Sequence, residues 1–188
     1  MYLFIAILGY IFLAIVNIFD KFILTKAVPK PIVVVFYSTA LILPIFLLIP
    51  FGAGYLGNWL SYLIAAIGGV FFGLALWAMF IGFQKSEISH AGPLVGATTP
   101  FFVLFLSQLF LKEQLTSYQI IGIIILIIGS LIISAEKSKE HHGWHNDMLW
   151  LILAGLLYAI SHVASKYIYD SYGFYSGLVW TRGFMGVF

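Results

Sequence analysis

Long apolar runs separated by short polar breaks dominate this chain. About seven such runs can be drawn, at residues 2–24, 32–51, 59–83, 88–111, 118–134, 148–169 and 174–188. Most of them approach or exceed the roughly 20 residues that a helix needs to cross a ~30 Å hydrocarbon layer. The pattern therefore predicts successive membrane-spanning helices rather than the core of a soluble domain.

Local signals sharpen several helix boundaries. Pro29 and Pro31 fit a boundary after the first run, whereas Pro44 lies inside the second, where neighbouring helices can satisfy the freed carbonyl. The sequence Thr116-Ser-Tyr-Gln119 has the pattern of a capping box. In that motif the Thr116 hydroxyl bonds the amide of Gln119 and the Gln119 side chain bonds back. It predicts a sharp start to the fifth helix.

Two glycines of the third run are spaced for close helix contact. Gly69 and Gly73 are four residues apart, so they share one helical face and let another backbone approach. Such spacings also arise by chance in glycine-rich apolar sequence.

Composition supports the membrane class and narrows the partners. Hydrophobic residues make up 62% of the 188 positions and charged residues 9%, against roughly 25% charged in soluble domains. The net charge of +2 is dispersed, so no nucleic-acid partner is expected. The chain has no cysteine, which excludes disulfides and thiolate metal sites.

The clearly aqueous segment is residues 136–147, which we interpret as a linker. It contains His141, His142 and His145 close to Glu140 and Asp147. A metal site needs these side chains in a folded cage, whereas a polar linker carries them without one. We therefore expect no metal and no cofactor.

The chain also shows an internal repeat. A shift of 145 positions superposes identical residues, including Ile7 on Ile152, Ala14 on Ala159 and Lys21 on Lys166. The lysine pair is informative because charges are rare here. A five-helix unit followed by a second copy gives two copies of opposite orientation, the inverted-repeat plan of many secondary transporters. We expect about ten helices and on the order of 290 residues in the intact protein, with the second unit incomplete at Phe188.

Residues 91–129 carry a resemblance to a known family. They contain Pro100, then Leu111-Lys112-Glu113-Gln114-Leu115-Thr116, then Gln119, Gly122 and Gly129. This run resembles the EamA-type repeat of the drug/metabolite transporter superfamily, in which Glu113 would fix helix ends. The resemblance implies a first repeat of five transmembrane helices at residues 1–135 and an incomplete second repeat at residues 148–188.

The predicted fold is an all-α polytopic membrane protein, an inverted-repeat helical bundle with about seven transmembrane segments of an expected ten. Its orientation stays open. One membrane side receives most of the lysines, namely Lys21, Lys26, Lys30, Lys85, Lys137 and Lys139. The positive-inside rule then places the N-terminus outside, whereas the family resemblance implies a cytoplasmic N-terminus.

Polar groups at membrane depth are costly and are functional candidates by default. Asp20 and Lys21 lie near a helix end, where they act either as an interfacial anchor or as an ion-coupling site. His162 aligns with Asn17 in the repeat. A histidine titrates near physiological pH, so His162 either carries a proton or makes an interhelical hydrogen bond.

Further candidates line a predicted substrate pocket. Arg182 lies inside the seventh run and either binds an anionic substrate group or pairs with another helix. Thr98 and Thr99 precede Pro100, which frees a backbone carbonyl and can turn it towards a cavity. The set of pocket candidates is completed by Tyr10, Asn17, Trp77 and His90. The alternative for these residues is helix packing.

These observations predict a secondary transporter that moves a small organic metabolite or drug by alternating access. It would be a multi-pass protein of the plasma membrane, with the lipid bilayer and a small-molecule substrate as partners and a homodimer as one assembly. The alternatives are a non-transporting scaffold or assembly subunit, and a lipid-carrier flippase. An enzyme is not expected, because no nucleophile–base set or metal motif lies within the helices.

Overall fold

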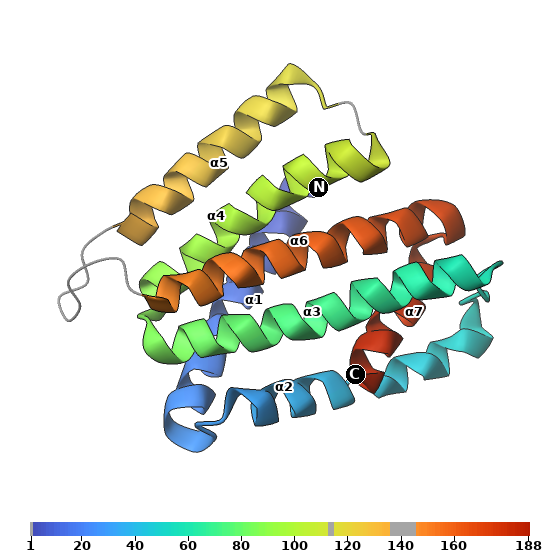
Figure 1. The fold of residues 1–188 in the computed structure, drawn as a ribbon, viewed down its shortest axis with the longest axis horizontal. Coiled ribbons are helices and arrows are strands. Elements are labelled where there is room, and N and C mark those ends of the chain that lie inside the picture. Colours follow the sequence, from blue (N-terminus) through green and yellow to red (C-terminus); the bar gives the residue numbers. More distant parts are fainter. Residues whose placement is uncertain (1, 113–114, 136–145) are drawn as a thin grey trace.

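A computed structural model describes residues 2–112, 115–135 and 146–188, and every regular element in these ranges is helical (Figure 1). The α-helices are α1 Tyr2–Phe22, α2 Pro31–Ala40, α3 Trp59–Lys85, α4 Ile88–Leu106, α5 Ser117–Ala135, α6 Asn146–Tyr172 and α7 Phe174–Val187. Three shorter helical segments continue or follow them, namely η1 Ile23–Ala27, η2 Leu43–Phe51 and η3 Ser107–Leu111.

The predicted membrane helices are confirmed within these ranges. Five helical stretches are long and apolar enough to cross a membrane, and the apolar part of α5, Ser117–Ile133, is shorter. The hinge residue Glu113 and positions 136–145 of the linker, including its three histidines, lie outside the described residues. The last two linker positions, 146 and 147, already belong to α6. The chain is thus a polytopic helical membrane protein.

Pro44 explains why the second membrane segment is divided. The α-helix α2 ends at Ala40, and a 3₁₀-helix, η2, continues from Leu43. A proline ring clashes with the carbonyl four residues earlier and has no N–H to donate, and the residue four before Pro44 is Ala40. The segment ends at Gly52, whose φ of 118° suits a glycine cap.

Helix α3 lies at the centre of the bundle, and small residues bring its neighbours close. A Cβ added at Gly69 would lie 2.5 Å from the backbone nitrogen of Met185 in α7. One added at Gly73 would lie 3.3 Å from the Phe188 ring. The close approach predicted from this glycine pair is confirmed. On the α6 side, the Ser161 hydroxyl donates to the Gly68 carbonyl at 2.6 Å.

Contacts at the two ends of α3 fix the helix directions. Lys21, at the end of α1, donates to the carbonyl of Ser86 just after α3 ends, at 2.9 Å. The hydroxyl of Tyr172, at the end of α6, lies 2.8 Å from that of Ser61 at the start of α3. Helix α1 therefore runs in the same direction as α3, and α6 runs in the opposite direction. An inverted repeat requires this opposite orientation of α1 and α6.

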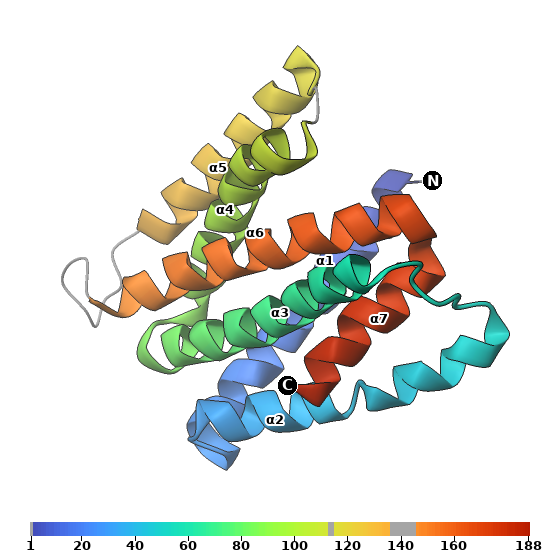
Figure 2. The same cartoon turned by 45° about the vertical axis from the view of Figure 1, so that its right-hand side comes forward.

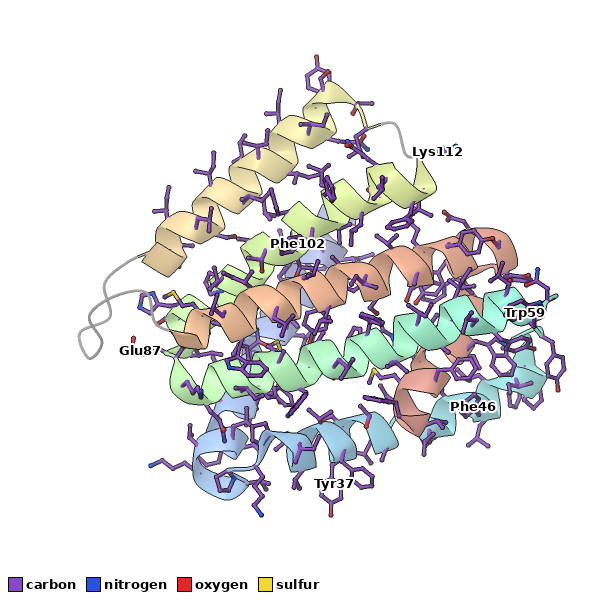
Figure 3. All side chains as sticks on the ribbon, viewed as in Figure 1. Tyr37, Phe46, Trp59, Glu87, Phe102 and Lys112 are labelled. Carbon is purple, nitrogen blue, oxygen red and sulfur yellow. The ribbon has the colours of Figure 1, made fainter. Side chains whose placement is uncertain are left out.

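Figure 3 shows the two ends of the bundle, with Glu87 at one and Trp59 and Lys112 at the other. Phe46, also labelled there, projects from η2 to α7, where its ring occupies the space that a Cβ on Gly183 would need. The glycine therefore makes room for the ring.

Helix α5 packs along α4 and stands away from the rest of the bundle (Figures 1 and 2). Of the two hydrogen bonds of the predicted capping box, one is confirmed and the other is wrong. The Gln119 side chain does accept from the Thr116 N–H, at 2.9 Å. The Thr116 hydroxyl, however, bonds the same Gln119 oxygen at 3.1 Å, and the amide of Gln119 donates to the Thr116 carbonyl instead.

Candidate functional site

Helix α1 turns a polar face to the bundle. Residues 4–22 of this helix are exposed except for Asn17, Asp20 and Lys21. These positions follow the three- and four-residue spacing that places side chains on one helical face. The face continues into η1 with Leu24, which is 1% exposed and belongs to the main hydrophobic core. An apolar helix thus presents its few polar side chains inward.

Lys21 has a structural role on this face. Its ammonium donates to the carbonyl oxygens of Phe83, Gln84 and Ser86 at the C-terminal end of α3. The Gln84 side chain in turn donates to the carbonyls of Leu24 and Pro29, at 3.1 and 2.7 Å. A cation suits a helix C-terminus because the last carbonyls lack intrahelical partners. Lys21 therefore caps the C-terminal end of α3.

A second group of side chains gathers around the ring of Phe72 on α3. The Arg182 guanidinium carbon of α7 lies 3.9 Å from the centre of that ring, a cation–π contact. From α6, the Tyr158 ring meets Phe72 edge-on at 5.0 Å, and the His162 ring stacks on Tyr158 at 6.1 Å. We call Phe72, Tyr158, His162 and Arg182 the Phe72 cluster.

The Tyr158 hydroxyl of the Phe72 cluster lies inside the bundle. Tyr158 is buried, and among the described residues its hydroxyl donates only to the Met79 sulfur, at 3.7 Å. Sulfur is a weak acceptor. Asn17, one turn before Asp20, faces Gly92 of α4, at 3.9 Å from the position of a Cβ. The Phe72 cluster thus joins α3, α6 and α7, whereas α1 contacts α3 and α4.

Arg182 has unused hydrogen-bonding capacity. It lies eight residues after the start of α7, which is about 12 Å along the helix at 1.5 Å per residue. Within the part of the chain that the structure describes, its half-buried guanidinium contacts the Phe72 face and donates no hydrogen bond. A guanidinium has five N–H donors in a planar fork that matches carboxylate and phosphate groups.

Thr98 and Thr99 lie where α4 crosses α6. The Thr98 hydroxyl donates to the Leu94 carbonyl at 2.9 Å, and a Cβ on Gly155 would collide with the Thr98 side chain. The Thr99 hydroxyl is buried and has no hydrogen-bond partner in the described residues. Gly155 precedes Tyr158 by three residues, so this crossing adjoins the Phe72 cluster without joining it.

The other three predicted residues lie away from the cluster. The His90 ring lies 3.2 Å from the Ile133 carbonyl and 3.6 Å from the Glu87 carboxylate, and so ties α4 to α5. Trp77 pairs with Trp150 at 6.4 Å. Tyr10 is 67% exposed on α1. The described residues also contain no group of three or more side chains suited to holding a metal ion.

Phe72 and Tyr158 were not predicted from sequence. Tyr158 had a signal, because it precedes His162 by four residues in an otherwise apolar stretch and so shares its face. Phe72 had none, since it is one of 18 phenylalanines. Of the residues that were predicted, His162 and Arg182 belong to the Phe72 cluster, and Asn17 lies at the contact between α1 and α4.

Comparison with known proteins identifies the family. The model of the EamA-like transporter family matches residues 1–135. The chain belongs to this family. A similar protein is an uncharacterized transporter of Archaeoglobus fulgidus, 36% identical over 73 residues. The match covers 38% of this EamA-like chain and 26% of the relative, about a quarter of its length. No solved structure matches the chain.

Proposed function

We propose that this EamA-like protein is a secondary transporter that moves a small organic metabolite or drug by alternating access. We further propose that its substrate carries an anionic group, such as a carboxylate, that binds Arg182. Family membership supports transport in general. One observation carries the proposal of an anionic substrate. The Arg182 guanidinium lies at membrane depth against Phe72, and its N–H groups donate no hydrogen bond to the described residues.

The cost of a charge within the membrane supports a binding role. Such charges are rare and mark substrate or ion pathways unless they are paired. The guanidinium carbon lies 3.9 Å from the centre of the Phe72 ring, and the described residues accept none of the guanidinium's N–H groups. A planar anion at the edge of the guanidinium gains two parallel charge-assisted bonds, and a neutral compound gains less.

The location of the Phe72 cluster suits alternating access. Phe72 comes from the family-matched region, whereas Tyr158, His162 and Arg182 come from the helices after it. In transporters built from inverted repeats, the substrate site lies at the interface between the repeats near the bilayer midplane. A substrate bound to Arg182 would contact both parts, so their relative motion would change its access.

The test is a transport screen of anionic, neutral and cationic metabolites in cells that express the protein. Arg182→Ala should reduce transport of anionic compounds at least tenfold, because a bidentate charge-assisted contact is lost. Arg182→Lys should restore part of it. Lys30→Ala, which removes an exposed cation from the start of α2, is the matched control. An equal loss for neutral and anionic compounds in Arg182→Ala would contradict the anion proposal.

We also propose that the protein resides in the plasma membrane, where a transporter of external compounds acts. Fractionation of cells that express a tagged chain should place it with plasma-membrane markers. Its recovery with another membrane would refute this location without touching the transport proposal.

A further inference from the structure

Helix α6 carries polar side chains at four-residue intervals. Tyr158, His162 and Lys166 are spaced so that they share one face of the helix. Tyr158 is buried, whereas His162 and Lys166 are exposed. His162 lies ten residues before the end of α6 at Tyr172, which is about 15 Å along the helix at 1.5 Å per residue. This distance places the His162 ring well inside a ~30 Å hydrocarbon layer.

His162 and Arg182 lie beside the same aromatic ring. The Arg182 guanidinium carbon is 3.9 Å from the centre of the Phe72 ring, and the centre of the His162 ring is 6.2 Å from it. Because both distances end at one point, the guanidinium carbon and the imidazole centre are within about 10 Å of each other. Helices α6 and α7, which carry the two side chains, pack together. Neither side chain makes a hydrogen bond with the described residues.

The elements around His162 provide no carboxylate. Helix α6 packs against α3, α4, α7 and η3, and these four elements contain no aspartate and no glutamate. The acidic residues of α6 itself, Asp147 and Asp170, are 15 and 8 residues from His162, or about 22 and 12 Å along the helix. A protonated His162 would therefore lie beside the guanidinium without a carboxylate from any of these elements.

The other titratable groups leave Arg182 as the charge that acts on His162. Those on α3, α4 and α7 lie near helix ends, namely Tyr62, Lys85, His90 and Tyr175. Those on α6 are Lys166, one turn along the same face, and the phenols of Tyr158, Tyr167, Tyr169 and Tyr172. Asp20 of α1 acts on Tyr158 and not on His162. A negative charge for His162 and Arg182 must therefore come from a ligand.

We propose that His162 is a second binding residue for the anionic substrate at Arg182, and that it binds the anion in its protonated form. This inference rests on the proposed function. The anion supplies the negative charge that the surrounding helices lack. An imidazolium donates from its ring nitrogens, so His162 adds a charge-assisted hydrogen bond to those of Arg182.

Binding of the anion and binding of the proton are then coupled. A nitrogen of neutral His162 takes a proton from water on the side to which the site is open, and the resulting N–H donates to the anion. Because coupling between two binding events is reciprocal, the proton strengthens anion binding and the anion strengthens proton binding. When the site opens to the other side, the anion and the proton are both released to water. One proton therefore crosses with each anion in the same direction.

The role of His162 is tested by the pH dependence of KM for an anionic compound that the transport screen identifies. The full chain is reconstituted in phosphatidylcholine vesicles, with equal pH on both sides, between about pH 5.5 and 8.5. We expect the wild-type KM to rise about tenfold per pH unit once the histidine is mostly neutral, because one proton binds with each anion. In His162→Gln the KM should be high at every pH, and in His162→Arg it should be low at every pH.

His90→Gln is the matched control, since it removes a histidine that contacts Glu87 and lies away from the Phe72 cluster. It should keep the wild-type pH dependence. Any ionisation of the compound itself affects all variants equally. A wild-type KM that does not change with pH, or a pH dependence that survives in His162→Gln, would overturn the role of His162. A KM in His162→Arg as high as in His162→Gln would also overturn it.

Proton movement is measured in the same vesicles with a trapped pH-sensitive dye. Uptake of the anionic compound should acidify the lumen of wild-type vesicles, after subtraction of the signal from empty vesicles. It should not do so with His162→Arg, because a permanent cation binds the anion without taking up a proton. Transport that requires Arg182 but moves no proton would overturn the inference and leave the proposed function standing. A screen that finds no transported anionic compound would instead refute the proposed function.

Discussion

Helices α1 and α3 are both apolar and both long enough to span a membrane, yet they are used differently. Over an 18-residue apolar stretch of each, 44% of α3 is buried against 6% of the segment that α1 begins. Helix α3 meets α6 and α7 through glycines, with backbones close enough that a Cβ at Gly69 would overlap α7. Helix α1 meets the bundle through Asn17, Asp20 and Lys21.

The difference shows which contacts hold the bundle together. Lipid is as apolar as leucine, so helices in membranes associate through close packing of small residues and through hydrogen bonds. The glycines of α3 supply the first of these. A polar inward face adds less packing, and polar groups at membrane depth are costly. Lys21 is the polar residue of this face with a structural role, since it caps α3.

The largest expected effect is on the α3–α7 contact. Gly69→Ala places a methyl group against the α7 backbone, so we expect a loss on the order of 3 kcal/mol, as in overpacked cores. Gly96→Ala in α4 is the matched control, because a Cβ there meets nothing within 4 Å and alanine favours a helix. Thermal unfolding followed by tryptophan fluorescence measures both. Equal stability of the two variants would show that the close packing at Gly69 does not hold the bundle together.

A smaller effect is expected at the cap on α3. Lys21→Met keeps an unbranched side chain but removes the donor to the α3 carbonyls, so we expect a loss of about 1–2 kcal/mol. Lys26→Met, at an exposed position later in η1, serves as the comparison. If heating in detergent unfolds both variants at the same temperature, the cap contributes nothing to stability.

Much of the fold could be predicted because membrane helices are recognisable by their length and lack of charge. Runs without charge define the segments, and the spacing of Gly69 and Gly73 indicates a close helix contact. Local backbone detail was predicted less well. Pro44 lies inside one membrane-length segment, as predicted, but the change from α-helix to 3₁₀-helix before it was not predicted. The reciprocal bond of Gln119 was right, but the partner of the Thr116 hydroxyl depended on local geometry.

The site was harder to predict because its contacts are distant in sequence. Lys21 caps carbonyls 62 to 65 residues away, and a lysine near a helix end gives no sign of such a target. Thr98 beside Pro100 fits a pocket and a helix crossing equally well in sequence, and the structure places it at the α4–α6 crossing. Arg182 was conspicuous as a charge, but Phe72 beneath it was not.

Binding of the transported substrate at the Phe72 cluster can be tested with Phe72→Leu. The change removes the aromatic face under Arg182 while keeping an apolar side chain, and Phe71→Leu makes the same change one position earlier in α3. A cation–π contact contributes about 0.5–2 kcal/mol. Initial-rate transport of an anionic compound should therefore show a KM raised roughly twofold to thirtyfold in Phe72→Leu and nearly unchanged in Phe71→Leu. Equal KM values in the two variants would contradict substrate binding at this cluster.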